Sequence, residues 1–233
     1  MTAPATASLA SVLLKRWGIR ALSPTGIAPL DPARCRFAGR AVTMRYLPLR
    51  EDLVARFHPV SPDAPSHDAM EAVRPGDVVV IEAEGRAEAG ILGEFMAMTL
   101  QAAGAVGVVC DAGMRDVVEL RAIGMPVWCR GPAAASSSAG LMLVEHGRPV
   151  ALGGTTVMPG DLVVGDEDGV VVCPASLWDE ALVEVTQREA MERYVRQRVA
   201  AGAALRGLYP PGEATQQAFA RWQAAGEPDE AIT

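Results

Sequence analysis

Residues 93–131 constrain the fold most, because they alternate twice between a helical pattern and a short apolar run. "GEFMAMTLQAAG" (93–104) has apolar residues at helical spacing and ends on glycine, and "RDVVELRAIG" (115–124) repeats that arrangement. The short apolar runs "AVGVVC" (105–110) and "MPVWCRG" (125–131) follow these segments and are typical of buried strands. This helix–strand–helix–strand succession indicates a parallel sheet flanked by helices.

The segments in front of this block predict one helix, two strands and a long loop. A helix is expected at 8–17 with Ser8 as its N-cap, a strand at 37–48, and a buried strand within 75–84. Residues 50–73 between the strands are rich in Pro, Ser and Asp. They predict a segment that is mostly loop, with room for a helical turn in its first half.

The segments after the block predict a β-rich second half. Residues 131–140 form a low-complexity loop, and 141–174 contain short apolar runs separated by Gly, Pro and Asp. Within them, "GDEDGVVVCP" predicts a β-hairpin with Asp168 and Gly169 at its turn.

A single domain of 1–233 is expected from the chain length. It divides into four parts, which are an N-terminal helical segment (1–36), an α/β core (37–175), a long helix (176–207) and a tail (208–233). Ser176 is the expected cap of the long helix, which is charged and amphipathic and is longer than a core requires. We therefore expect it to pack on a neighbouring subunit.

Composition excludes several classes of protein. The net charge of −7 disfavours nucleic-acid binding, which depends on clustered Lys and Arg. No run of 18 apolar residues is present, so no membrane span is expected, and the basic residues near the N-terminus follow the apolar run, unlike those of a secretory signal. The four cysteines lack any CxxC pair and indicate free thiols without structural zinc. We expect a cytoplasmic protein.

The sequence places a cation and two carboxylates where the second helix opens. Arg115 can bind a carboxylate at two points, Asp116 can bind Mg²⁺ or Mn²⁺, and Glu119 on the same helix face can hold a metal-bound water. The free amides of the turn at 93–96, where the preceding helix begins, form an anion cradle. Together these groups suit a small carboxylate substrate beside a hard cation.

A purely structural interpretation explains the same spacing. Asp116 and Glu119 in a first helical turn complement the helix dipole, and Arg115 with Glu119 is an ordinary i,i+4 pair. Charge spacing alone leaves both interpretations open.

The stretch "GEFMAMTLQAAGAVGVVCDAGMRDVVELRAIGMPVWCRG", with "PGDLVVGDEDGVVVCP" downstream, resembles the RraA-like family. The family includes 4-hydroxy-4-methyl-2-oxoglutarate and 4-carboxy-4-hydroxy-2-oxoadipate aldolases. The resemblance implies a layered α/β/β/α-type sandwich with a parallel central βαβ unit, a β-rich second half and a long C-terminal helix. It also implies a homo-oligomer, trimeric or hexameric, with sites at subunit contacts.

In the aldolase branch an acid is followed, after twenty intervening positions, by Arg-Asp and then, after two more intervening positions, by another acid. Glu94, Arg115, Asp116 and Glu119 match that pattern, although Glu94 replaces the usual Asp. The resemblance implies a class II pyruvate aldolase in which Asp116 binds the metal directly and Arg115 contacts the substrate. It also implies that the amides of Gly93, Glu94, Phe95 and Met96 hold the pyruvate carboxylate, while Glu119 and Glu94 bind the metal's water shell.

The expected reaction is metal-dependent cleavage of a 4-hydroxy-2-oxo acid to pyruvate, with oxaloacetate decarboxylation as a companion activity, because both produce pyruvate enolate. The very low lysine content, with Lys15 alone, disfavours a Schiff-base aldolase. The family's regulator members, which bind an RNase E-type ribonuclease, imply the alternative of a non-catalytic regulator. A methyltransferase is disfavoured because no GxGxxG loop follows a strand.

Overall fold

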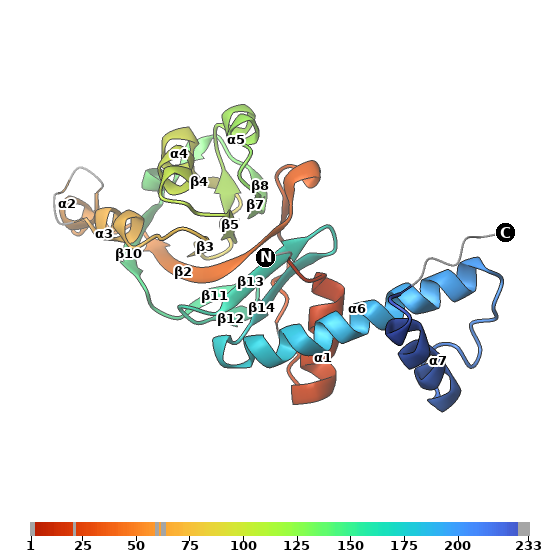
Figure 1. Cartoon of the computed structure of the whole chain (residues 1–233). Helices are drawn as coiled ribbons and strands as arrows, with labels where there is room; N and C mark the ends of the chain where they lie inside the picture. The colour runs from red at the N-terminus through yellow and green to blue at the C-terminus, as the bar shows by residue number, and fades with distance from the viewer. Residues whose placement is uncertain (1–2, 21, 59–60, 62–63, 228–233) are drawn as a thin grey trace. The chain divides into compact units, whose positions relative to one another are not determined.

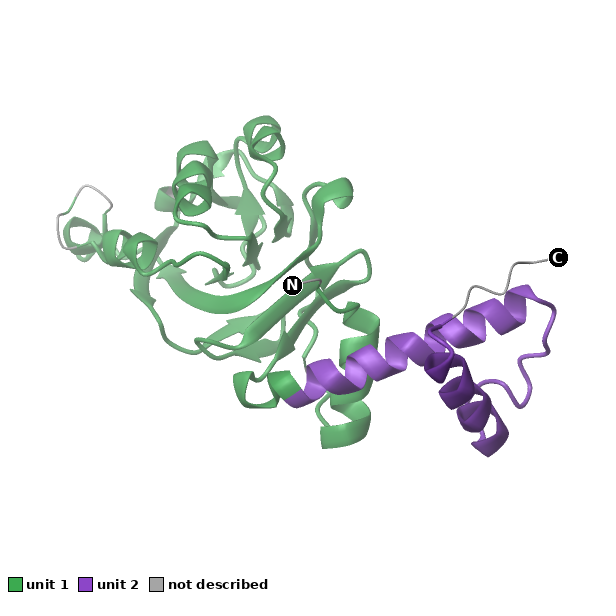
Figure 2. Cartoon of the chain, viewed as in Figure 1, with its two compact units in different colours: residues 1–179 green, residues 180–233 purple. Residues whose placement is uncertain are grey.

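The computed structural model describes residues 3–20, 22–58, 61 and 64–227, which form two compact units (Figure 2). The first unit spans residues 1–179 and the second residues 180–233. The predicted boundary at 176, where the long helix was expected to begin, lies close to this division.

The main sheet of the first unit runs in the order β1-β7-β5-β3-β2-β13-β14, and β10 also pairs with β2. Strands β7, β5, β3 and β2 are parallel, as the sequence predicts, and the remaining pairs are antiparallel. The strands are β1 (Ala28–Pro29), β2 (Phe37–Pro48), β3 (Asp77–Glu82), β5 (Gly107–Cys110), β7 (Val127–Cys129), β10 (Leu141–His146), β13 (Leu162–Asp166) and β14 (Gly169–Cys173).

Two smaller sheets complete the β structure of the described residues. One is parallel throughout and runs β8-β6-β4-β9; the other is the antiparallel hairpin β11–β12. Their strands are β4 (Ala89–Leu92), β6 (Gly113–Met114), β8 (Gly131–Pro132), β9 (Ala135–Ser136), β11 (Val150–Leu152) and β12 (Thr155–Val157). The very short parallel strands β4, β6, β8 and β9 were not predicted.

The helices of the first unit agree with the expected pattern in the central block, at the N-terminus and in the first half of 50–73, and one further helix was not expected. They are α1 (Thr6–Trp17), α2 (Val54–Phe57), α3 (Pro65–Glu71), α4 (Glu94–Ala102) and α5 (Val117–Ile123), with 3₁₀ turns at Pro32–Arg34, Ser137–Ala139 and Ala175–Leu177. Ser8 is not an N-cap: α1 begins two residues earlier, after Ala5, and Ser8 is buried inside it. Helix α3 lies in the segment expected to be mostly loop, because Pro65 at its first position starts the helix rather than breaking it.

The central strand β3 is buried on both faces, which produces the predicted layers. Val79 and Ile81 point into an apolar core shared with α3, α4 and α5. Val78 and Val80 point to the opposite face, into a second core with residues of β11–β14. Figure 1 shows α4 and α5 side by side on the first of these faces. This arrangement confirms the expected mixed α/β sandwich.

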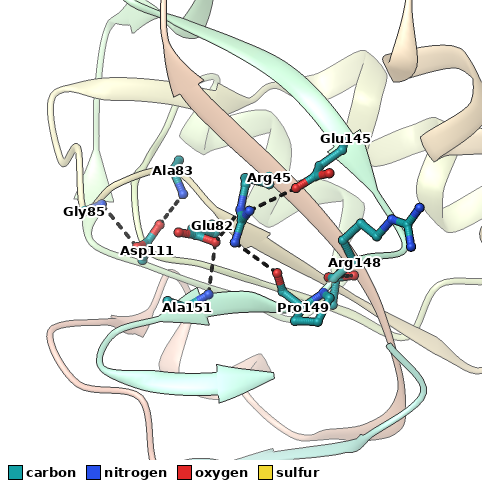
Figure 3. A network of polar contacts seen from close by, with 10 residues as sticks. Arg45, Glu82, Ala83, Gly85, Asp111, Glu145, Arg148, Pro149 and Ala151 are labelled. Carbon is teal, nitrogen blue, oxygen red and sulfur yellow. Dashed lines mark hydrogen bonds and ion pairs between the residues drawn. The ribbon is translucent and has the colours of Figure 1, made fainter. Parts of the chain in front are cut away.

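Polar contacts hold the carboxyl ends of β3 and β5 (Figure 3). The Asp111 carboxylate accepts hydrogen bonds from the backbone N–H of Ala83 at 2.6 Å and of Gly85 at 3.1 Å. Burial raises the pKa of Asp111, although these two amides oppose the shift. Beside it, Arg45 on β2 donates to Glu82 at 3.1 Å and to Glu145 at 3.0 Å. The Arg45 contacts tie β2, β3 and β10 together. Asp111 joins the end of β5 to the chain that follows β3, so it has a structural role.

The β13–β14 hairpin confirms the predicted turn with a shift of one residue. Gly169 pairs with Asp166, so Glu167 and Asp168 form the two-residue turn, and not Asp168 with Gly169. Asp166 also fixes α1, since its carboxylate accepts from Thr6 N at 2.8 Å and from Thr6 Oγ at 2.5 Å.

The second unit contains most of α6 (Trp178–Ala200) and α7 (Glu213–Ala224). Tyr194 of α6 packs against Phe219 and Trp222 of α7, with ring centroids 5.6 to 5.9 Å apart. The long helix was expected at 176–207, but Ser176 lies in a 3₁₀ turn and the helix ends at Ala200. The tail expected from 208 contains α7, because its aromatic residues have a partner on α6. None of the described helices is long and apolar enough to cross a membrane.

Candidate functional site

The site predicted around Arg115 and Asp116 lies where two adjacent parallel strands end. Strands β4 and β6 are parallel, with Gly90 opposite Gly113 and Leu92 opposite Met114, and the register shifts between these two pairs. β4 leads through Gly93 directly into α4, and β6 leads through Arg115 and Asp116 directly into α5. Residues 22 positions apart in the sequence therefore meet at one edge of the small sheet.

Gly93 permits the close approach of these two turns. A Cβ added to Gly93 would lie 2.4 Å from Asp116 Oδ2 and 2.8 Å from Arg115 Nε, both closer than real Cβ contacts allow. The backbone of Gly93 is ordinary extended chain, with φ −121°. Its lack of a side chain, rather than any special conformation, is therefore what the site requires.

Asp116 adopts the left-handed conformation, with φ 52° and ψ 46°, as the N-cap of α5. Asp is one of the few residues that tolerate this conformation, which otherwise costs about 1 kcal/mol or more. In this position Asp116 Oδ2 accepts a hydrogen bond from Glu94 N at 3.1 Å and lies 3.6 Å from Arg115 Nε. The side chains of Arg115 and Asp116 keep 43% and 40% of their surface exposed, so both are accessible to a ligand.

The first turn of α4 supplies the predicted anion cradle only in part. The amide of Ala97 donates to Gly93 O at 3.1 Å and begins the helical hydrogen bonding. The amides of Phe95 and Met96 precede it and have no acceptor within the helix. The amide of Glu94, in contrast, already donates to Asp116.

The predicted carboxylates do not form a conventional metal cage. Among the described residues, no three His, Cys, Asp or Glu side chains lie close enough together to hold a metal ion, and no ion pair joins Arg115 to Glu119. Glu119 is exposed in the first turn of α5. Mg²⁺ often binds through one or two carboxylates and keeps several waters, so the half-exposed carboxylate of Asp116 fits this ion. The structure thus joins Gly93, Arg115, Asp116 and the Glu94 backbone, and leaves Glu94 and Glu119 as water-mediated candidates.

A cavity of about 400 Å³ adjoins the start of α4 and was not predicted from the sequence. Phe95, Met96 and Thr99 of α4 form part of its wall. The rest comes from β2, α2, α3, β10, the 3₁₀ turn at Ser137–Ala139, and the loop residues Leu49 and His58. Its wall comes from segments far apart in the sequence, so no local pattern identifies it.

Comparison with known proteins yields a family match over most of the chain. The family described as RraA-like (Aldolase/RraA) matches residues 6–172. A Halalkalibacterium halodurans protein named "Putative 4-hydroxy-4-methyl-2-oxoglutarate aldolase" is 36% identical over 138 residues, which cover 57% of this chain. The match spans 65% of that relative's length, slightly less than two thirds.

Two solved structures share the fold over more than four fifths of the chain. An uncharacterized protein from Pseudomonas syringae pv. tomato is 28% identical with a TM-score of 0.77, and the match covers 88% of each chain. Streptomyces coelicolor RraAS2, described as an unusual member of the RNase ES inhibitor RraA protein family, is 33% identical with a TM-score of 0.73. That match covers 82% of this chain and 91% of RraAS2.

Proposed function

Because the chain belongs to the RraA-like family, we propose that it is a divalent-metal-dependent lyase that cleaves a 4-hydroxy-2-oxo acid to pyruvate and a second carbonyl compound. The observation that carries the proposal is the packing of Arg115 and Asp116 against Gly93 at the start of α4. The aldolase name of the Halalkalibacterium relative supports it. Oxaloacetate decarboxylation is included because it leaves the same pyruvate enolate.

In this proposal Asp116 is the direct ligand of Mg²⁺ or Mn²⁺, and the carboxylates of Glu94 and Glu119 orient the metal's waters. A metal held there would supply stabilisation of the negative charge that develops on the keto oxygen. Arg115 and the amides of Phe95 and Met96 bind the substrate carboxylate. Arg115 therefore fixes the orientation of the 2-oxo acid relative to Asp116.

The proposed cleavage needs no lysine. The bond between C3 and C4 breaks, the C4 hydroxyl loses its proton to become a carbonyl, and the electron pair remains on the pyruvate fragment as an enolate, which takes up a proton at C3. Lys15, the single lysine of the sequence, is exposed in the last turn of α1, and α1 packs on β13 and β14. It is therefore remote from the turn that holds Arg115.

Substitution of Asp116 by Asn tests the proposal. Asn tolerates the left-handed conformation and keeps an acceptor for Glu94 N, so D116N should fold like the wild type. Removing the charge should reduce Mg²⁺-dependent pyruvate release from 4-hydroxy-4-methyl-2-oxoglutarate and from oxaloacetate by about 100-fold or more. Mn²⁺ binding, followed by electron paramagnetic resonance, should weaken in parallel.

Asp168→Asn is the matched control, because it removes one exposed carboxylate from the β13–β14 turn. It should keep both activity and Mn²⁺ binding. Pyruvate release by the wild type that persists in EDTA, or that survives D116N, would exclude the metal-dependent lyase.

The alternative function is that of a non-catalytic regulator that binds an RNase E-type ribonuclease. The similarity to Streptomyces coelicolor RraAS2 supports this alternative. The same assay separates the two functions, because a regulator releases no pyruvate. Titration of the purified protein into an RNase E-type ribonuclease, with RNA cleavage as the readout, would then identify the regulator by its inhibition.

We also propose a homo-oligomer, a trimer or hexamer. Phe95 on α4 and Val118 on α5 are 77% and 73% exposed, and Met98 is 50% exposed, so the outer face of these helices carries large apolar side chains. Exposed apolar groups of this kind are typical of subunit contacts. Light scattering after size-exclusion chromatography measures the subunit number, and a monomer at micromolar concentration would contradict this proposal. The predicted cytoplasmic location stays a prediction.

A further inference from the structure

The cavity beside α4 has no role in the proposed function. It measures about 400 Å³, a size typical of small-molecule sites. Gly93, Glu94, Arg115 and Asp116, which form the candidate lyase site, do not line it. Its wall comes instead from β2, β10, α2, α3 and side chains of α4. The cavity is therefore a second candidate ligand site within the first unit.

Most of the wall is apolar. Leu141, Met142 and Leu143 of β10 line it and are only 2%, 8% and 5% exposed. Met70 of α3 and Met96 of α4 line it from the helices, and methionine side chains adapt readily to the shape of a ligand. Apolar surface of this kind is stabilised when an apolar molecule displaces water from it. The wall thus favours a ligand with an apolar body.

The Ser66 hydroxyl is a polar group in this wall that lacks a partner. Ser66 Oγ is buried and forms no hydrogen bond with the described residues. Other hydroxyls of the wall are satisfied: Thr99 donates to Phe95 O at 2.8 Å, and Ser138 Oγ lies 3.0 Å from Ser136 Oγ. Buried polar groups in native proteins nearly always have a partner. The orphaned hydroxyl therefore indicates that a partner binds in the cavity.

Tyr46 adds a second hydroxyl to the wall. Its side chain is 6% exposed, and its hydroxyl makes no hydrogen bond within the part of the chain that the structure describes. Burial raises the pKa of Tyr46, so the phenol keeps its proton and stays a donor. A single water would partner one hydroxyl, but it occupies only about 30 Å³ and leaves the apolar wall uncovered.

We infer that this cavity binds a compact, largely apolar molecule that carries one acceptor oxygen, such as a ketone, and that Ser66 donates a hydrogen bond to this oxygen. The apolar body covers Met70, Leu141 and their neighbours, and the oxygen satisfies the buried hydroxyl. The inference is independent of the lyase, because the wall contains none of the four residues of the candidate lyase site.

Two probes of nearly equal shape test the inference on the full chain. Acetophenone carries a carbonyl oxygen where α-methylstyrene carries a CH₂ group. Saturation-transfer NMR titrations give the Kd of each, and acetophenone should bind with a Kd of about 1 mM or tighter, as expected for a fragment of this size. No saturable binding of acetophenone by the wild type would overturn the inference.

Ser66→Ala removes the proposed donor without changing the apolar wall. The Kd of acetophenone should rise about three- to tenfold, while that of α-methylstyrene should stay within about twofold. Ser176→Ala, an exposed serine outside the cavity, is the matched control and should change neither Kd. Equal effects of S66A on both probes, or no effect on either, would contradict the assignment of Ser66.

The stability of the ligand-free protein is a second readout. S66A should raise Tm by about 2–4 °C, because it removes a buried hydroxyl that has no partner. S176A should leave Tm unchanged. A lower Tm in S66A would show that the hydroxyl is already satisfied in the folded protein, which would overturn the inference.

Pyruvate with Mg²⁺ tests whether the cavity is separate from the proposed lyase site. The Kd of acetophenone should stay constant as pyruvate is added in excess, because the two ligands use different residues. A Kd that rises in proportion to the pyruvate concentration would place both ligands in one site and overturn the inference. Absence of pyruvate release in the lyase assay would refute the proposed function alone, since binding of acetophenone needs neither metal nor catalysis.

Discussion

Replacing Gly93 by alanine disturbs the candidate site without altering either of its charged side chains. The new methyl group would lie 2.4 Å from Asp116 Oδ2 and 2.8 Å from Arg115 Nε. An ordinary contact begins at 3.4 Å, so Asp116 Oδ2 must move by about 1 Å, and Arg115 Nε by somewhat less. Both side chains are partly exposed and can move away from the methyl group.

A displacement of this size should cost about 100-fold in kcat/KM, because catalytic groups about 1 Å out of place lose most of their effect. The cost in stability should be small. The Glu94 N to Asp116 Oδ2 hydrogen bond is worth about 1 kcal/mol, and alanine recovers about 0.4–1 kcal/mol by restricting the unfolded chain. We expect Tm to change by less than about 4 °C.

Gly212→Ala is the matched control, because Gly212 is also the N-cap of a helix, α7, and has an ordinary φ of −80°. A Cβ there meets nothing within 4 Å, so this variant should keep full activity. The measurements are kcat/KM for Mg²⁺-dependent pyruvate release and Tm by calorimetry, for both variants beside the wild type.

Two results would refute the reasoning. G93A with wild-type activity would show that the positions of Arg115 and Asp116 against Gly93 do not matter for catalysis. G93A that fails to fold would show that the two side chains cannot move aside, so that the turn is a structural contact.

Three further predictions concern the buried polar and thiol groups. Burial raises the pKa of all four buried cysteine thiols, so none should react with DTNB within minutes at pH 8 in the native protein, and all four should react in denaturant. Burial raises the pKa of the Cys173 thiol from 9.0 to about 11. The folded state therefore binds this proton more tightly than the unfolded state does. The stability that results is complete below pH 9 and is lost as the pH rises to about 11. The difference in urea-unfolding free energy between wild type and Cys173→Ala should shrink over that range, and a constant difference would contradict the shift. Asp166→Ala should cost about 2–3 kcal/mol, because it strips the buried Thr6 N and Oγ of their acceptor, whereas Asp168→Ala should cost less than about 0.5 kcal/mol.

The central block, and with it the place of Arg115 and Asp116 at the start of a helix, was predictable because its signals are local. Apolar spacing and terminal glycines identify α4 and α5, and the parallel order of β5 and β7 follows from short connections between helix and strand. The family match confirms the resemblance that suggested Arg115 and Asp116 as site residues. Their assigned roles stay predictions.

The remaining features depend on contacts distant in the sequence. Strand β6 has two residues, too few for any periodicity, yet its pairing with β4 is what brings Asp116 to Gly93. Helix α7 is stabilised by aromatic packing on Tyr194 of α6. The sequence of the tail does not show this contact, because its Pro and Gly residues indicate a loop. The cavity is equally invisible in the sequence, because its wall comes from separate segments of the chain.

The candidate site lies beside β4 and β6, whereas much of the cavity wall lies on α2 and α3, and this separation has an evolutionary consequence. The turns that hold Gly93, Arg115 and Asp116 follow strands of one small parallel sheet, while much of the cavity wall comes from α2 and α3, which lie between β2 and β3 in the sequence. Sequence changes in α2 and α3 leave the Arg115 and Asp116 turn intact. A scaffold of this kind can acquire new selectivity by exchanging one peptide, so chimaeras grafted at 50–73 are a direct route to redesigned specificity.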